Sequence, residues 1–156
     1  MNKHIIDFMK GQKAASVCCA DANGHPYCFS CYYTFNEKDH LLLFKTSKDS
    51  HHAQLLDKKA EVAGTILPDK LENLTVKGIQ FSGILLEAEH ILCVNSSKLY
   101  HKKFPFALAM SGDVMSIRLD TIKMTDSSMG FGKKLLWARE EEPNASLIAD
   151  ESFLNN

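Results

Sequence analysis

One segment, DVMSIRLDTIKMTD (residues 113–126), constrains the fold of this chain more than any other. Its apolar side chains alternate with polar ones, which is the period of a β-strand with one buried face. The alternation slips by one residue after Asp120, because the apolar positions are Met115, Ile117, Leu119, Ile122 and Met124. Such a slip would turn the later apolar side chains to the wrong face unless a β-bulge absorbs it. Because bulges provide the bends that a closing sheet needs, the segment predicts a long, bent strand of a β-barrel.

The other β-rich segments predict an antiparallel sheet around this strand. The turn clusters DANGHP and FNEKD separate three of the segments, so these three form a meander. Gly83, inside a later segment, is a candidate for a bulge or a bend. The strands are expected at AASVCCA, YCFSCYYTF, LLLFKT, EVAGTIL, VKGIQFSGILLEAEH and GKKLLWARE. Connections of hairpin length disfavour a parallel sheet.

Helices are expected at three places. Residues 2–10 carry apolar side chains at helical spacing. SKDSHHAQLLDKK opens with serine and aspartate residues that can cap a helix, and NSSKLYHKKF is closed by Pro105. The chain is therefore expected to be mainly β (α+β), a β-barrel with two or three short helices.

Length and charge limit the domain organisation and the classes of partner. The 156 residues suit one domain, which we place at residues 1–140, followed by a loosely ordered tail at 141–156. A net charge of −1 provides no global attraction to nucleic acid or to an anionic membrane. The N-terminus lacks a signal-peptide core and no apolar run approaches a membrane span, so we expect a cytoplasmic protein.

The five cysteines include a C-x-x-C pair, Cys28 and Cys31. On a strand these two side chains point to opposite faces and cannot grip one metal ion. Zinc sites place C-x-x-C on a tight turn, and a thioredoxin-like pair needs a helix N-terminus. We therefore predict no metal site and interpret the cysteines as free thiols that serve as small strand residues.

The segment KTSKDSHHAQ (residues 45–54) has the composition of a phosphate site. A strand end delivers residues 45–48 to the start of a helix opened by Ser50, His51 and His52. Hydroxyls, cations and free helix N–H groups converge there, which is how a phosphate is held. A capped and solvated helix start explains the same residues equally well, and both interpretations stay open.

With these elements placed, residues 16–66 resemble the FMN-binding split-barrel family that includes pyridoxamine 5′-phosphate oxidase. The motifs that carry the resemblance are the turn from Asp21 to Pro26 with Gly24, the pair Tyr32–Tyr33, and the pair Thr46–Ser47. Further along, KGIQFSG, YHKKFP, IRLDTIKMTD and GFGKKLLWAR look like the small YhbP-type branch of this superfamily. The resemblance covers roughly residues 10–139 and implies an antiparallel split β-barrel.

The resemblance also implies a homodimer that binds FMN at the subunit interface. Thr46, Ser47, His51 and His52 then take the phosphate, and Lys45 or Lys48 adds positive charge. Gln80 and Trp137 are candidates to face the flavin, including from the partner chain. The alternative interpretations are a solvated strand residue for Gln80 and a core or interface anchor for Trp137. The predicted cofactor-binding set is Lys45, Thr46, Ser47, Lys48, His51, His52, Gln80 and Trp137, with no catalytic side chain assigned.

Two departures from the family pattern restrict the function. His51 stands where the family usually has arginine, so the bidentate guanidinium grip on phosphate is lost. After Trp137 the chain offers Arg139 but no histidine, so it lacks the pair that binds substrate in true pyridoxamine 5′-phosphate oxidases. His101, with Lys102 and Lys103, is a candidate anion site, for which a solvated helix end is the favoured interpretation.

The sequence thus leads to two functional hypotheses and a third that depends on His51. The first is an FMN-dependent oxidoreductase that acts on an unidentified small molecule with an unidentified electron donor. The second is a non-catalytic flavin- or haem-binding protein on the same scaffold. In the third, an apo structural protein results if His51 abolishes phosphate binding.

Overall fold

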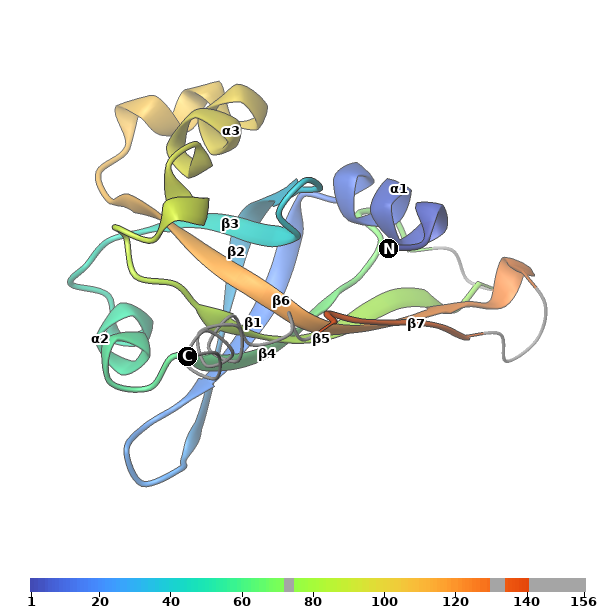
Figure 1. Ribbon diagram of the computed structural model, residues 1–156, viewed down its shortest axis with the longest axis horizontal. Coiled ribbons are helices and arrows are strands. Elements are labelled where there is room, and N and C mark those ends of the chain that lie inside the picture. The colour runs from blue at the N-terminus through green and yellow to red at the C-terminus, as the bar shows by residue number, and fades with distance from the viewer. Residues whose placement is uncertain (72–74, 130–133, 141–156) are drawn as a thin grey trace, which may run out of the picture.

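The computed structural model describes residues 1–71, 75–129 and 134–140 (Figure 1). Within these residues, seven antiparallel strands form one sheet in the order β3-β2-β1-β4-β5-β6-β7. A further pairing between β3 and β6 closes six of the strands into a barrel, and β7 extends the sheet beyond β6. The mainly β barrel expected from the sequence is therefore confirmed.

The predicted elements correspond closely to the observed ones. The strands are β1 (Ala14–Ala20), β2 (Pro26–Asn36), β3 (Leu41–Thr46), β4 (Glu61–Ile66), β5 (Lys77–Leu85), β6 (Asp113–Asp126) and β7 (Lys134–Ala138). The helices are α1 (Lys3–Gly11), α2 (His51–Lys58) and α3 (Ser96–Lys103), with 3-10 turns η1 (Ile91–Cys93), η2 (Pro105–Ala109) and η3 (Ser127–Met129). One boundary was wrong, because the strand expected to run to residue 90 ends at Leu85.

The bulge predicted in β6 is present. Ser82 of β5 pairs with Thr121, whereas the next residue, Gly83, pairs with Leu119. Asp120 is thus the extra residue, and the apolar side chains on both sides of it stay inside the barrel. Gly83 is required here because a Cβ atom at this position would lie 2.2 Å from the Arg118 carbonyl oxygen.

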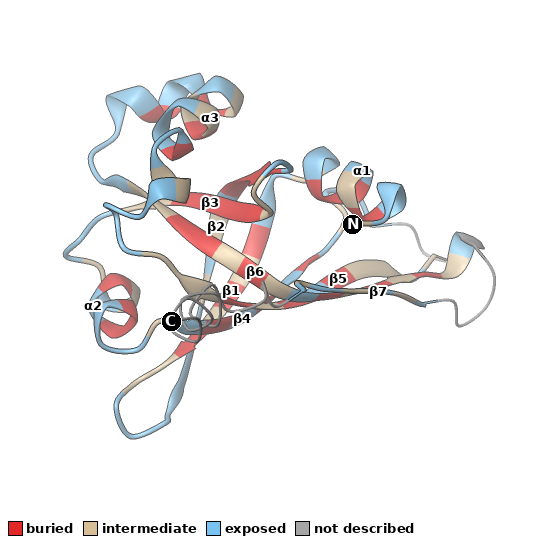
Figure 2. Ribbon diagram, viewed as in Figure 1, coloured by how far each residue is buried: buried red, intermediate tan, exposed pale blue. Residues whose placement is uncertain are grey.

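The core fills the barrel and reaches the first helix. Apolar side chains on the inner face are buried, as the red segments of β3 and β6 indicate (Figure 2). Tyr33 is fully buried, and its hydroxyl donates a hydrogen bond to the carbonyl oxygen of Met9 in α1 (2.7 Å). A second cluster, Leu41, Leu43, Tyr100, Phe104 and Ala107, joins β3 to α3 and η2. These contacts pack α3 and η2 against β3.

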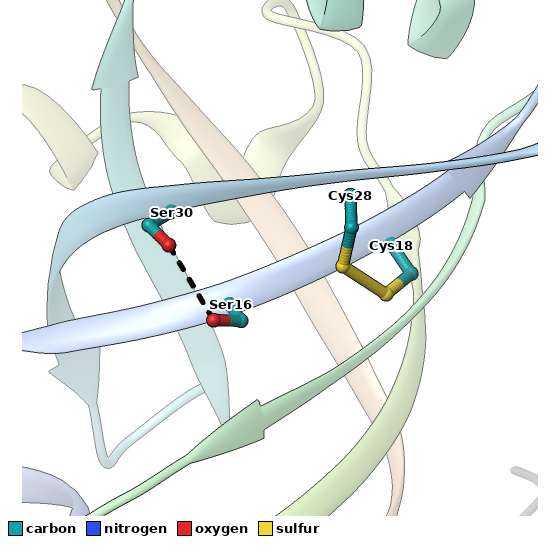
Figure 3. Close-up of a disulfide and its surroundings, with 4 residues drawn as sticks. All are labelled: Ser16, Cys18, Cys28 and Ser30. Atoms are coloured by element: carbon teal, nitrogen blue, oxygen red, sulfur yellow. Dashed lines mark hydrogen bonds between the residues drawn. A yellow bond between two sulfur atoms is a disulfide. The ribbon is translucent and has the colours of Figure 1, made fainter.

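The interpretation of all five cysteines as free thiols was wrong for two of them. Cys18 and Cys28 form a disulfide between β1 and β2 (Figure 3), whereas Cys19, Cys31 and Cys93 are free. Alternation along one strand correctly separates Cys28 from Cys31. It could not reveal the disulfide, because a cross-strand pair depends on the register of two strands.

Two further expectations concern the ends and the helices of the chain. The tail expected at residues 141–156 lies outside the described residues. Of the helices within the described ranges, each is too short or too polar to cross a membrane.

Candidate functional site

The candidate site begins where β3 ends and α2 starts. Thr46 is the last residue of β3, and Ser50 is the N-cap of α2. The Ser50 Oγ accepts a hydrogen bond from the Ala53 backbone N–H (3.3 Å), which satisfies one of the free donors of the first turn. A short polar turn therefore brings the strand end and the helix start together, as the sequence predicted.

Thr46, Ser50 and His52 form a connected hydrogen-bonding cluster. Thr46 Oγ1 lies 2.6 Å from His52 Nε2 and 3.1 Å from Ser50 Oγ. Because each hydroxyl both donates and accepts, the direction of this chain depends on the tautomer and charge of His52. We call these three residues the hydroxyl–imidazole cluster.

Two aromatic residues of β2 pack against the two histidines of α2. The His52 ring stacks on Phe29, with ring centroids 3.9 Å apart and planes 12° from parallel. His51 meets Tyr27 edge to face at 4.9 Å. Burial lowers the pKa of His52, and the neighbouring His51 lowers it further, so the fold favours the neutral ring.

A cavity of about 290 Å³ opens beside the hydroxyl–imidazole cluster. Thr46 and His52 line it on one side, and Tyr32, Tyr100 and Phe106 add aromatic surface. It therefore combines a polar end made by β3 and α2 with an apolar wall made by β2, α3 and η2. A flat aromatic molecule with an anionic or polar end fits this distribution of groups.

The two lysines predicted for the phosphate point to other partners. Lys45 Nζ donates to the carbonyl oxygens of Ala107 and Met110 at 2.7 Å each, so it secures η2 to β3. Lys48 is exposed and lies 3.4 Å from a carboxylate oxygen of Asp113. The sequence could not predict the role of Lys45, because η2 follows it by some sixty residues along the chain.

The remaining predicted residues separate into two places. Ser47 lies in the turn before α2, where its Oγ accepts from the Asp49 N–H (3.3 Å). Gln80 and Trp137 lie elsewhere, in an open cavity of about 530 Å³ over β5, β6 and β7. Within one chain the structure thus brings Lys45, Thr46 and His52 into one cavity, and Gln80 and Trp137 into another.

The YHKKF segment does not form an anion-binding cluster in the described residues. His101 Nε2 lies 3.4 Å from Lys45 Nζ, at the wall formed by η2. Lys103 turns the other way and donates to the carbonyl oxygen of Gln12 (2.6 Å), and burial lowers its pKa. Across the described ranges, no group of three or more His, Cys, Asp or Glu side chains is placed to hold a metal ion.

Comparison with known proteins identifies the family. No protein-family model matches the chain. The YhbP protein of Escherichia coli K12 is 34% identical over 122 residues, which cover 78% of this chain and 83% of that protein. This chain belongs to the YhbP (UPF0306) family. The resemblance to the YhbP-type branch inferred from its motifs is thereby confirmed.

Solved structures place this YhbP-family fold among split barrels with different ligands. A haem-binding protein from Mycobacterium smegmatis aligns with a TM-score of 0.70 at 12% identity, over 84% of this chain and 55% of that one. A pyridoxamine 5′-phosphate oxidase-related, FMN-binding protein from Nostoc punctiforme aligns with a TM-score of 0.62 at 11% identity, over 88% of each chain. At such low identity the similarity shows the fold alone.

Proposed function

We propose that this YhbP-family protein is an FMN-binding flavoprotein and an oxidoreductase that acts on a small molecule. One observation carries the proposal: the hydroxyl–imidazole cluster stands at the polar end of a cavity with an aromatic wall. A flavin mononucleotide has the matching shape, a flat aromatic ring system joined to a phosphate.

The residues at the polar end fit a phosphate through hydrogen-bond donors rather than through fixed cations. The hydroxyls of Thr46, Ser47 and Ser50 surround the first turn of α2, where backbone N–H groups lack acceptors within the helix. His51 is exposed beside this turn and takes the position of the family arginine. An imidazole lacks the bidentate grip of a guanidinium, and Lys45 cannot fully compensate because it is bound to carbonyl oxygens. We therefore expect weaker phosphate binding than an arginine at position 51 would give.

The size of the cavity favours a site completed by a second protomer. About 290 Å³ lies just below the range for small-molecule sites, which is roughly 300–1,000 Å³. In a homodimer, the second cavity of one protomer, with Gln80 and Trp137, would be available to cover the flavin of the other. This arrangement accounts for two predicted residues that lie apart within one chain.

When bound, the flavin supplies the electron or hydride chemistry. The chain's own groups would bind and orient it: Thr46 and Ser50 would hold the phosphate end, and Tyr32 and Phe106 would exclude water from the ring system. A neutral His52 keeps Thr46 in place through their hydrogen bond. No side chain is required as a nucleophile or as a general base.

The test is the visible absorption spectrum of the purified protein before and after addition of FMN. We expect a shifted flavin spectrum for the natural protein and for Ser16→Ala, which removes from β1 a hydroxyl that lines neither cavity. Thr46→Val keeps the shape but removes the hydroxyl, and we expect at least tenfold weaker FMN binding. Unperturbed FMN with the natural protein would refute the proposal.

A second candidate is a flavin- or haem-binding protein without turnover, since a haem-binding protein of M. smegmatis shares the fold. Steady oxidation of a reduced pyridine nucleotide with an electron acceptor would support the enzyme. A bound but inert flavin would support the carrier. A Soret band after addition of haem would support the haem-binding alternative.

A further inference from the structure

The disulfide lies at the point where the β1–β2 hairpin leaves the barrel. Cys18 and Cys28 are directly opposite in the ladder, with Cα atoms 4.2 Å apart, and Cys18 is also the last β1 residue that pairs with β4. Residues 19–27 continue beyond it as a two-stranded arm that projects past α2 (Figure 1). We call these residues the hairpin arm.

The pair is accessible from solution through Cys28. Cys28 is exposed and Cys18 half-buried, and both lie beside Ser16 and Ser30 on the outer face of the sheet (Figure 3). Cys19 is buried. Cys31 lies on the opposite face of β2, where burial raises the pKa of its thiol to about 12. Small thiols and disulfides can therefore reach the pair, and accessible disulfides are the ones that exchange readily.

We propose that Cys18 and Cys28 are a reversible thiol–disulfide pair, oxidised by small-molecule disulfides and reduced by small-molecule thiols. In oxidation, the thiolate of one cysteine attacks a low-molecular-weight disulfide and releases one thiol, leaving a mixed disulfide on the protein. The second cysteine then attacks the protein sulfur of that mixed disulfide and releases the second thiol. Two protein thiols become one disulfide, and their two hydrogens and two electrons pass to the departing thiols. No flavin takes part, so this inference is independent of the proposed function.

The state of the pair determines how firmly the hairpin arm is held. Two strands without a third neighbour are marginally stable in water, so a covalent link at the base of the arm matters. The arm and its base carry Tyr27 and Phe29, which contact His51 and His52 at the start of α2. Reduction therefore loosens the aromatic support of the candidate site while the closed barrel stays intact.

The test is thiol labelling and peptide mapping of the folded, purified protein in mixtures of reduced and oxidised glutathione. We expect two thiols to lose reactivity together as oxidised glutathione increases, with a Cys18–Cys28 cross-linked peptide, and to return on addition of reductant. In the reduced form, amide hydrogen exchange should become several-fold faster in residues 19–27 and stay unchanged in β5 and β6.

Three variants make the result specific. Cys18→Ser and Cys28→Ser should each abolish the paired loss of reactivity, whereas Cys93→Ser removes a thiol outside the pair and should leave it unchanged. If the thiols of Cys18 and Cys28 stay reactive in excess oxidised glutathione, the proposal is overturned. So would a cross-link between other cysteines, or a disulfide that is reduced only after the protein is unfolded.

Discussion

His52 connects the aromatic support of the candidate site to its polar end. Its ring stacks on Phe29, and its Nε2 shares a hydrogen bond with Thr46. When the imidazole is neutral, Nε2 can accept from Thr46; when it is protonated, Nε2 must donate. Protonation therefore turns the Thr46 hydrogen away from the ring and adds a positive charge beside the proposed phosphate.

The lowered pKa of His52 makes the apoprotein less stable in mild acid. The unfolded chain binds a proton to this histidine near its ordinary pKa of 6.5, whereas the folded protein binds it only at lower pH. The contribution of the neutral His52 to the free energy of unfolding is thus complete above pH 6.5. It is lost as the pH falls through the pKa of His52 in the folded protein. We expect the midpoint of thermal unfolding to decrease when the pH is lowered from 7 to 5. In His52→Gln this decrease should be smaller.

His4→Gln is the control variant, because His4 is exposed on α1, which lies on the other side of the molecule from α2 (Figure 1). His40, whose pKa is also lowered by burial and by Arg139, remains in every variant. The test is therefore the difference in the pH dependence of Tm between His52→Gln and the natural protein. An identical pH profile for the two would contradict the assignment.

At the scale of elements, the start of α2 depends on one side chain. Ser50 caps the helix and also contacts Thr46, so Ser50→Ala removes two interactions. Loss of a cap costs about 1 kcal/mol, which lowers Tm by roughly 2–4 °C in a domain of this size. Thermal unfolding measures the change, with Ser97→Ala in the exposed part of α3 as a control that shifts Tm by less than about 2 °C.

The bulge between β5 and β6 is the second element on which the fold depends. At Gly83 a methyl group would overlap the Arg118 carbonyl oxygen, which belongs to the backbone of β6 and cannot move aside. We expect Gly83→Ala to destabilise the protein by about 2–4 kcal/mol. Denaturant unfolding would measure this difference.

Gly11 is the matched control for Gly83, because an added Cβ meets no atom within 4 Å there. It lies in α1, where alanine is favoured over glycine by roughly 0.5–1 kcal/mol. Gly11→Ala should thus leave stability unchanged or raise it. Equal losses for both variants would contradict the steric explanation.

At the scale of the molecule, the proposed homodimer should use the open face over β5, β6 and β7. Leu136 is 74% exposed at the cavity that contains Gln80 and Trp137. Burial of such a side chain favours association, and a charge there opposes it. We expect sedimentation to show a dimer for the natural protein and a monomer for Leu136→Lys. Ile91→Lys, at a residue 77% exposed in η1, should remain dimeric.

The sequence was informative where one strand or one helix suffices to define a feature. The slip after Asp120 correctly located a bulge, and Ser50 correctly located a helix start. It was incomplete where distant segments meet. Lys45, predicted to bind the phosphate, lines the candidate cavity, but the sequence did not show that its Nζ donates to the carbonyl oxygens of Ala107 and Met110. The free-thiol interpretation failed for Cys18 and Cys28 for the same reason.

The sequence by itself therefore determined the elements, their inward faces and the family of this protein, since local periodicity and ordered motifs record these directly. The tertiary structure decided the closure of β3 on β6, the register that joins Cys18 to Cys28, and the division of the predicted residues between two cavities. These features depend on pairings between residues far apart in the chain. Periodicity within a single segment carries no information about which partner it will face.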